Sequence, residues 1–103
     1  MNKRLKKKKG LLIDKKELYN LDKTLAEYIL PRVKRFREIN KESYPADLKD
    51  MKAWNKILDQ IIFSFQYSLK ESIEADEKIR EKNQRKYKKG MKLFAEYFED
   101  LWL

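Results

Sequence analysis

The sequence predicts an all-α fold, a compact bundle of about three helices with a disordered basic N-terminal arm. Its 103 residues include two Gly and two Pro, and this scarcity argues against the many turns of a β-sandwich or barrel. Apolar residues recur every three or four positions along most of the chain, which is the period of an α-helix. Hydrophobic residues make up 42% of the chain, so one small core can be filled.

Residues 1–10 are the predicted arm. They hold six Lys or Arg and no acidic residue, and so carry six of the nine net positive charges of the chain. A terminal lysine block is most often a solvated, disordered segment, and the alternative is a dedicated arm for nucleic acid or a membrane surface. Residues 11–103 form the predicted helical domain, in which residues 11–20 are expected to be a short extended or turn-rich lead-in.

The first predicted helix spans residues 22–40. Asp22 is expected to accept hydrogen bonds from the first turn, with Leu21 as a hydrophobic staple. Apolar side chains then follow at helical spacing, namely Leu25, Tyr28, Ile29, Val33, Phe36 and Ile39. Pro31 lies inside this helix, where it removes one hydrogen bond and is expected to kink the axis.

The second predicted helix spans residues 47–74, with Asp47 as its N-cap. A stripe of apolar residues runs along it, and Ile57 and Phe63 lie off that stripe. A helix that is apolar over much of its circumference is expected to be central in the bundle, or covered by a second subunit.

The third predicted helix spans residues 76–102. Whether it continues the second helix or follows a break near residues 74–76 stays open at this point. Gly90 lies near the edge of its apolar face. We expect a close approach of two helices there, with a hinge or a ligand contact as the alternative.

The residue content excludes several kinds of chemistry. The chain has no Cys and no His, which removes thiol nucleophiles, disulfides, Ser-His triads and the usual zinc sites. Two glutamate pairs have a spacing similar to that of the metal-binding pairs of all-α nucleotide pyrophosphohydrolases. They are Glu71 with Glu74 and Glu96 with Glu99, and the helical wheel turns both pairs away from the core. The sequence therefore predicts no enzyme, no metal, no cofactor and no membrane span.

Arg32 lies in the middle of the apolar stripe of the first predicted helix. An unpaired guanidinium in a core would cost more than a small domain can tolerate. Three explanations are open. Arg32 extends past the core to solvent, pairs with a carboxylate such as Asp59 or Asp76, or lines a pocket for an anion.

A polar pocket is the functional hypothesis that these positions favour. Asn55 lies beside the core face of the second helix, and the alternative is a buried hydrogen-bond network that fixes helix register. In such a pocket, basic side chains would meet phosphates, aromatic rings would stack on a base and Asn55 would read its edge. The predicted phosphate contacts are Arg32, Arg35, Arg80, Arg85 and Lys86, and the predicted stacking rings are Trp54, Tyr28 or Tyr97.

Four segments resemble a family of small helical proteins encoded by tailed bacteriophages, especially those of Gram-positive hosts. The segments are LDKTLAEYILPRVKRFREIN, YPADL, AWNKILDQIIFSF and GMKLFAEYFEDLW, and the likeness spans residues 21–102. The resemblance implies a phage setting and the cytoplasm of the infected bacterium, and it carries over no functional residue. Small phage proteins without catalytic groups commonly act by binding.

Three binding functions follow as expectations. The first is capture of a phosphate-rich nucleotide, such as an immune second messenger, by an oligomeric phage protein that counters host defence. The second is nucleic-acid binding, in which residues 1–10 and the basic stretch from Lys78 to Lys92 follow a phosphate backbone. The third is inhibition of a host protein through an aromatic C-terminal cluster that is more simply core or a homo-oligomer surface. Its members are Phe94, Tyr97, Phe98, Leu101 and Trp102.

Overall fold

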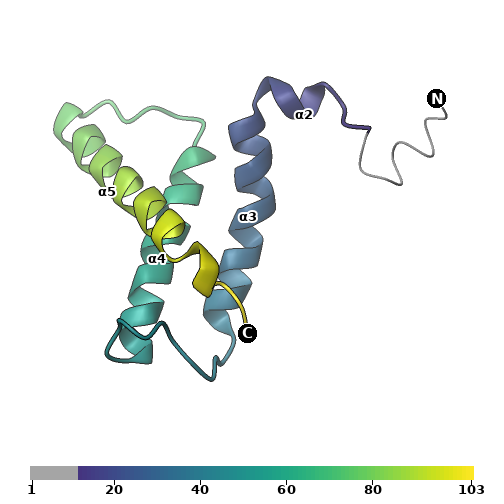
Figure 1. Ribbon diagram of the computed structural model, residues 1–103. Coiled ribbons are helices and arrows are strands. Elements are labelled where there is room, and N and C mark those ends of the chain that lie inside the picture. The colour runs from purple at the N-terminus through teal and green to yellow at the C-terminus, as the bar shows by residue number, and fades with distance from the viewer. Residues whose placement is uncertain (1–11) are drawn as a thin grey trace.

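A computed structural model describes residues 12–103, and the predicted all-α bundle is confirmed in them (Figure 1). The described residues contain helices, turns and loops, and no strand. The elements in chain order are α2 (Lys16–Tyr19), α3 (Leu21–Glu38), α4 (Met51–Ser68), α5 (Glu77–Glu96) and the 3-10 turn η1 (Phe98–Asp100). The predicted arm, residues 1–10, lies outside the described residues.

Helix α4 is the centre of the bundle, and both α3 and α5 pack against it. Figure 1 shows α3 alongside α4 and α5 crossing it at a steep angle. Most of the buried side chains come from α4, and they are Trp54, Leu58, Ile61, Ser64 and Phe65. Ala26 and Val33 of α3 and Tyr97 complete the buried core. The prediction of a central second helix is confirmed.

The start of α4 differs from the prediction. The helix begins at Met51, and its N-cap is Asp50, whose carboxylate accepts a 2.7 Å hydrogen bond from the Ala53 amide. Asp47, the predicted cap, lies in the preceding turns and accepts a 2.7 Å hydrogen bond from the Tyr97 hydroxyl. Two aspartates three residues apart offer the same capping chemistry, so the pattern alone could not select between them.

The start of α3 also differs. The helix begins at Leu21, so Asp22 lies inside its first turn rather than at the cap, where its charge still suits the positive end of the helix. The lead-in that was expected to be extended or turn-rich contains the four-residue helix α2, with a turn at each of its ends. The side chain of Asp14 accepts from the Lys16 amide and Glu17 accepts from the Asp14 amide, and these bonds support the extra turn. Helix α3 then continues through Pro31 to Glu38.

A break separates α4 from α5, so the two are not one continuous helix. The chain leaves the helical conformation after Ser68, and Asp76 caps α5 by accepting from the Ile79 amide at 3.1 Å. The second and third predicted helices were both too long at their C-terminal ends. The second ends at Ser68, and the third ends at Glu96, where the chain continues into η1.

Gly90 lies where α5 meets α4, and it is buried. A Cβ atom at this position would overlap the Ser64 hydroxyl oxygen and the Gln60 carbonyl oxygen. The Ser64 hydroxyl donates a 2.8 Å hydrogen bond to the Tyr87 carbonyl across the same contact. The expected close approach of two helices at Gly90 is confirmed.

Candidate functional site

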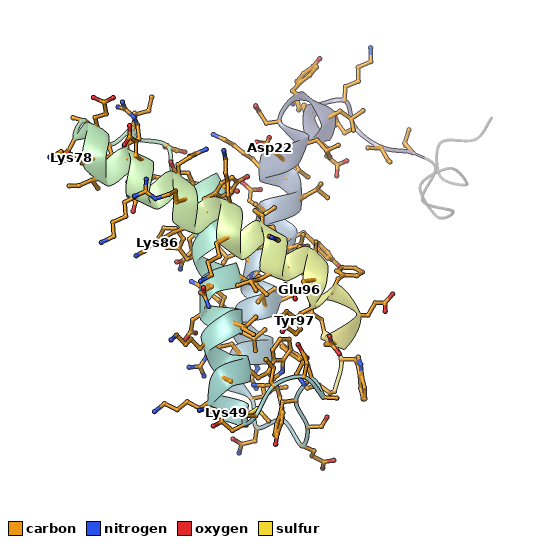
Figure 2. All side chains as sticks on the ribbon, turned by 60° about the vertical axis from the view of Figure 1, so that its left-hand side comes forward. Asp22, Lys49, Lys78, Lys86, Glu96 and Tyr97 are labelled. Carbon is orange, nitrogen blue, oxygen red and sulfur yellow. The ribbon has the colours of Figure 1, made fainter. Side chains whose placement is uncertain are left out.

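One face of α5 packs on α4, and the opposite face carries a straight row of cations that we call the α5 basic stripe. Its members are Lys78, Lys82, Arg85, Lys89 and Lys92. Their spacing of four, three, four and three residues places all five on one side of the helix, along about 21 Å of its axis. All five residues are exposed, and Figure 2 shows nitrogen-tipped side chains extending outward along α5, with Lys78 at its first turn and Lys86 near its middle.

The charges of the stripe have no carboxylate partners in the described part of the chain. The ion pairs found there join Arg35 to Glu38 and Arg37 to Asp59, and neither involves α5. Glu81 is the single acid between Lys78 and Lys92. The stripe is therefore a concentrated positive field open to solvent, of the kind that attracts an extended anion.

Beside the stripe, residues of α4 and α5 line a hollow of about 350 Å³ that is open to solvent, which we call the Phe63 groove. Its lining residues are Lys56, Asp59, Gln60, Phe63, Lys86 and Lys89. The half-buried Phe63 ring is the aromatic surface of the groove, and the Lys86 ammonium lies 5.4 Å from its centroid, in cation–π range. Lys89 belongs to both the groove and the stripe, so the two features adjoin.

Asp59 is the acid that lines the Phe63 groove, and it is already paired. The Arg37 guanidinium of α3 donates to both carboxylate oxygens, at 2.9 and 3.5 Å. The pair is largely exposed, so its contribution to stability is small. Its electrostatic effect is local. Arg37 offsets the acid and leaves three lysines to set a positive potential at the groove.

The predicted site residues of α5 are all exposed, but they differ in position and in contacts. Arg85 belongs to the basic stripe, and Lys86 borders the Phe63 groove. Arg80 turns back toward the start of the helix, where its guanidinium donates to the Glu74 carbonyl at 3.2 Å.

Arg32 does not lie in the core, and of its three open explanations the structure fits the first, in which the side chain reaches solvent. Arg32 is exposed, its guanidinium lies 3.7 Å above the Tyr28 ring, and it donates to the Tyr28 carbonyl at 2.8 Å. The buried side of α3 is centred on Ala26 and Val33, while Leu25 of the apolar stripe is 51% exposed. The pattern counted exposed apolar residues as core, so it rotated the expected inner face toward Arg32.

The other α3 candidates stay apart from α5. Arg35 is exposed and lies 3.6 Å from the Glu38 carboxylate. Tyr28 and Arg32 border a separate hollow that contains none of the α5 cations. The structure therefore does not bring the predicted phosphate contacts of α3 and α5 into one pocket.

Trp54 and Tyr97 do not offer stacking surfaces to a base, contrary to the prediction. Trp54 is 1% exposed and packs between Phe36, at 6.3 Å between ring centroids, and Tyr97, at 5.6 Å. Tyr97 is itself buried. Asn55 is half-buried, and its Oδ1 atom has no hydrogen-bond partner among the described residues.

The C-terminal aromatic cluster divides between core and surface. Phe94 packs edge-on against Phe65 at 4.9 Å, and Leu101 also packs on the core. Phe98 and Trp102 are 60% and 67% exposed. The expectation of a core role holds for the first group, and the second leaves apolar surface uncovered in the described chain.

The sequence interpretation missed Lys56 and Phe63 as site residues, whereas Lys89 lies within its basic stretch from Lys78 to Lys92. One signal was present for Phe63, which is a large apolar residue off the core stripe of its helix.

Among residues 12–103, no group of three or more His, Cys, Asp or Glu could hold a metal ion, and no helix is long and apolar enough to cross a membrane. No family model, curated protein or solved structure matches the chain.

Proposed function

We propose that this protein binds nucleic acid through the α5 basic stripe. The observation that carries the proposal is the straight row of five exposed cations without carboxylate partners in the described residues. Each strand of a duplex presents one phosphate per about 3.4 Å of helix axis, so a stripe of about 21 Å faces several phosphates in succession. Binding would release condensed counterions, and its affinity would fall steeply with salt.

The composition of the stripe favours binding that is independent of sequence. Four of its five members are lysines, which act as flexible point charges rather than as planar forks that fit one base edge. Phosphate contacts position a protein on nucleic acid and carry no sequence information. The six Lys and Arg of residues 1–10 would add to the same electrostatic attraction.

In the phage setting that the sequence resemblance implies, such a protein would be an accessory to viral or host nucleic acid and would act by binding rather than by catalysis. Capture of a phosphate-rich nucleotide stays a prediction, as do inhibition of a host protein and self-association. Thermal-shift measurements with cyclic dinucleotides and ADP-ribose derivatives test the first of these directly.

The proposal is tested by a charge-neutralising triple variant, Lys78→Gln with Lys82→Gln and Arg85→Gln. Fluorescence anisotropy with a labelled duplex at fixed, low salt would report its affinity. A matched control removes three exposed lysines elsewhere, through Lys34→Gln, Lys49→Gln and Lys52→Gln, so both variants lose the same net charge. We expect the stripe variant to lose at least about tenfold in affinity and the control about threefold or less. Equal losses would place the binding surface elsewhere.

A further inference from the structure

The Phe63 groove is the first of three hollows that follow one another along the α4–α5 contact. The second hollow shares Phe63 with it and adds Tyr67 and Lys70, and the third shares Tyr67 and Lys70 and reaches Arg80. Because neighbouring hollows share lining residues, they adjoin one another beside the basic stripe, and we call the three together the channel.

Two aromatic rings, Phe63 and Tyr67, line the channel, and a third ring, Tyr87, packs against Tyr67. The rings of Phe63 and Tyr67 are nearly parallel, with centroids 6.1 Å apart and planes 27° apart. The Tyr87 ring follows at 5.3 Å from Tyr67, with 36° between the planes. The Tyr67 hydroxyl donates to Gln84 Oε1 at 2.9 Å, which fixes the middle ring of the three. Phe63, Tyr67 and Tyr87 are all half-buried.

Cations border the channel on both helices. Lys56 and Lys70 come from α4, and Lys86, Lys89 and Arg80 come from α5. Two acids also line it. Asp59 is paired with Arg37, and Glu74 accepts from the Asp76 amide at 3.1 Å. Basic side chains thus flank aromatic rings, the combination with which proteins hold unpaired nucleic acid.

We propose that this channel holds single-stranded nucleic acid, with Phe63 as the surface on which a base stacks and the lysines at the phosphates. The inference rests on the proposed function and narrows its ligand to an unpaired strand. Bases in a duplex are paired and stacked on one another, so they cannot reach rings that are recessed between two helices, whereas unpaired bases can turn outward. The Phe63 groove, at about 350 Å³, lies in the size range of pockets that hold one small ligand group.

The Lys86 side chain lies over the Phe63 ring in the free protein, and a base would displace it. Its ammonium lies over the Phe63 ring on a long, flexible and exposed side chain. An arriving base would take the place of the ammonium above the ring, and Lys86 would turn to the adjacent phosphate. The exchange replaces one cation–π contact with a stacking contact and an ion pair.

The test compares Phe63→Leu with Phe98→Leu, a control that removes an exposed ring outside the channel. Anisotropy titrations at one salt concentration would use a labelled oligothymidylate, a duplex of equal length and labelled thymidine monophosphate. We expect tighter binding of the single strand than of the duplex. Phe63→Leu should weaken the single strand about five- to tenfold and the duplex less than twofold, with no change in the control.

Three outcomes would overturn the inference in distinguishable ways. If Phe63→Leu weakened the affinity for the single strand and for the duplex equally, or changed neither affinity, Phe63 would have no stacking role. Duplex binding by the stripe would then still stand. Tight binding of the monophosphate alone would assign the groove to a free nucleotide. If neither the single-stranded oligothymidylate nor the duplex bound, the proposed function would be overturned as well.

A second measurement uses the unmodified protein, in case Phe63→Leu does not fold. Photocrosslinking to a halogenated oligonucleotide, mapped by mass spectrometry, should mark Phe63 or Tyr67. Crosslinks confined to residues outside the channel would contradict the inference.

Discussion

Gly90 controls how closely α5 approaches α4. In an exposed helix interior, replacement of Gly by Ala stabilises the helix by about 1 kcal/mol. Here the added Cβ would overlap Ser64 and the Gln60 carbonyl oxygen, and the second of these is backbone that cannot move alone. We therefore predict that Gly90→Ala lowers the free energy of unfolding by about 1–3 kcal/mol, as measured by urea denaturation.

A second substitution separates this steric effect from a general effect on the helix. Ser64→Gly in the Gly90→Ala background removes the side chain that the new methyl group meets. The double variant should lose less stability than the two single variants lose together. A stabilised Gly90→Ala protein would show that the helices are not in close contact at this point.

Tyr97 is the residue with the clearest dependence on pH. Its hydroxyl donates to Asp47, and this hydrogen bond, with burial and the neighbouring carboxylates, raises the pKa of Tyr97 to about 12. The bond requires the protonated phenol. Its contribution to stability is fully present below pH 10.0, the ordinary tyrosine value, and is lost as the pH rises toward about 12.

Tyr97→Phe tests this assignment. The variant should be less stable than the wild type by about 1 kcal/mol at neutral pH, because it lacks the hydrogen bond to Asp47. That difference should shrink across the alkaline range in chemical denaturation curves recorded at several pH values. A difference that stays constant up to the pKa of Tyr97 would mean that its hydroxyl does not titrate with the fold.

At the scale of the elements, the helix caps identify which aspartates stabilise the helix starts. Asp50 and Asp76 accept hydrogen bonds from first-turn amides, at 2.7 and 3.1 Å. Replacing either by Ala should cost about 1 kcal/mol, read from thermal or urea unfolding. Asp22→Ala is the matched control, because Asp22 has the same charge in a first turn without being the cap. A cost for Asp22→Ala as large as for Asp50→Ala would contradict the observed start of α3.

The element pattern was predictable because burial on α4 requires a helical period in the sequence. The same period could not show which apolar residues stay exposed, and Leu25 and Tyr28 are both more than half exposed. This is why the pattern placed Arg32 on the inner face of its helix, although its side chain reaches solvent. The start of α4 depends on which aspartate side chain accepts a hydrogen bond from a first-turn amide. The choice between Asp47 and Asp50 therefore needed the three-dimensional structure.

At the scale of the whole molecule, the net charge of +9 is unevenly distributed. Residues 1–10 carry six of those charges, and the basic stretch from Lys78 to Lys92 was visible in the sequence. What the sequence could not show is the partner side of the channel. Lys56 and Phe63 reach it from α4, and their distance in sequence from α5 leaves no local pattern to connect them.

The division of the site across two helices also has a physical consequence. α4 supplies the central core, so the Phe63 and Tyr67 rings stand on the most buried element of the bundle. The contact at Gly90 holds the two helices together, so the backbone of α5 keeps its place along the channel. A rigid backbone of this kind loses little conformational entropy when an anion binds, and the cost that remains is the ordering of the exposed Lys and Arg side chains.

The salt dependence of binding shows most directly whether the α5 basic stripe contacts nucleic-acid phosphates. Affinity for a duplex would be measured across a series of salt concentrations for the wild type and for the variant with Lys78→Gln, Lys82→Gln and Arg85→Gln. Each phosphate contact contributes about 0.9 to the slope of log affinity against log salt. We predict a wild-type slope that is steeper than that of the variant by about 2–3. Equal slopes would show that these three side chains contact no phosphate.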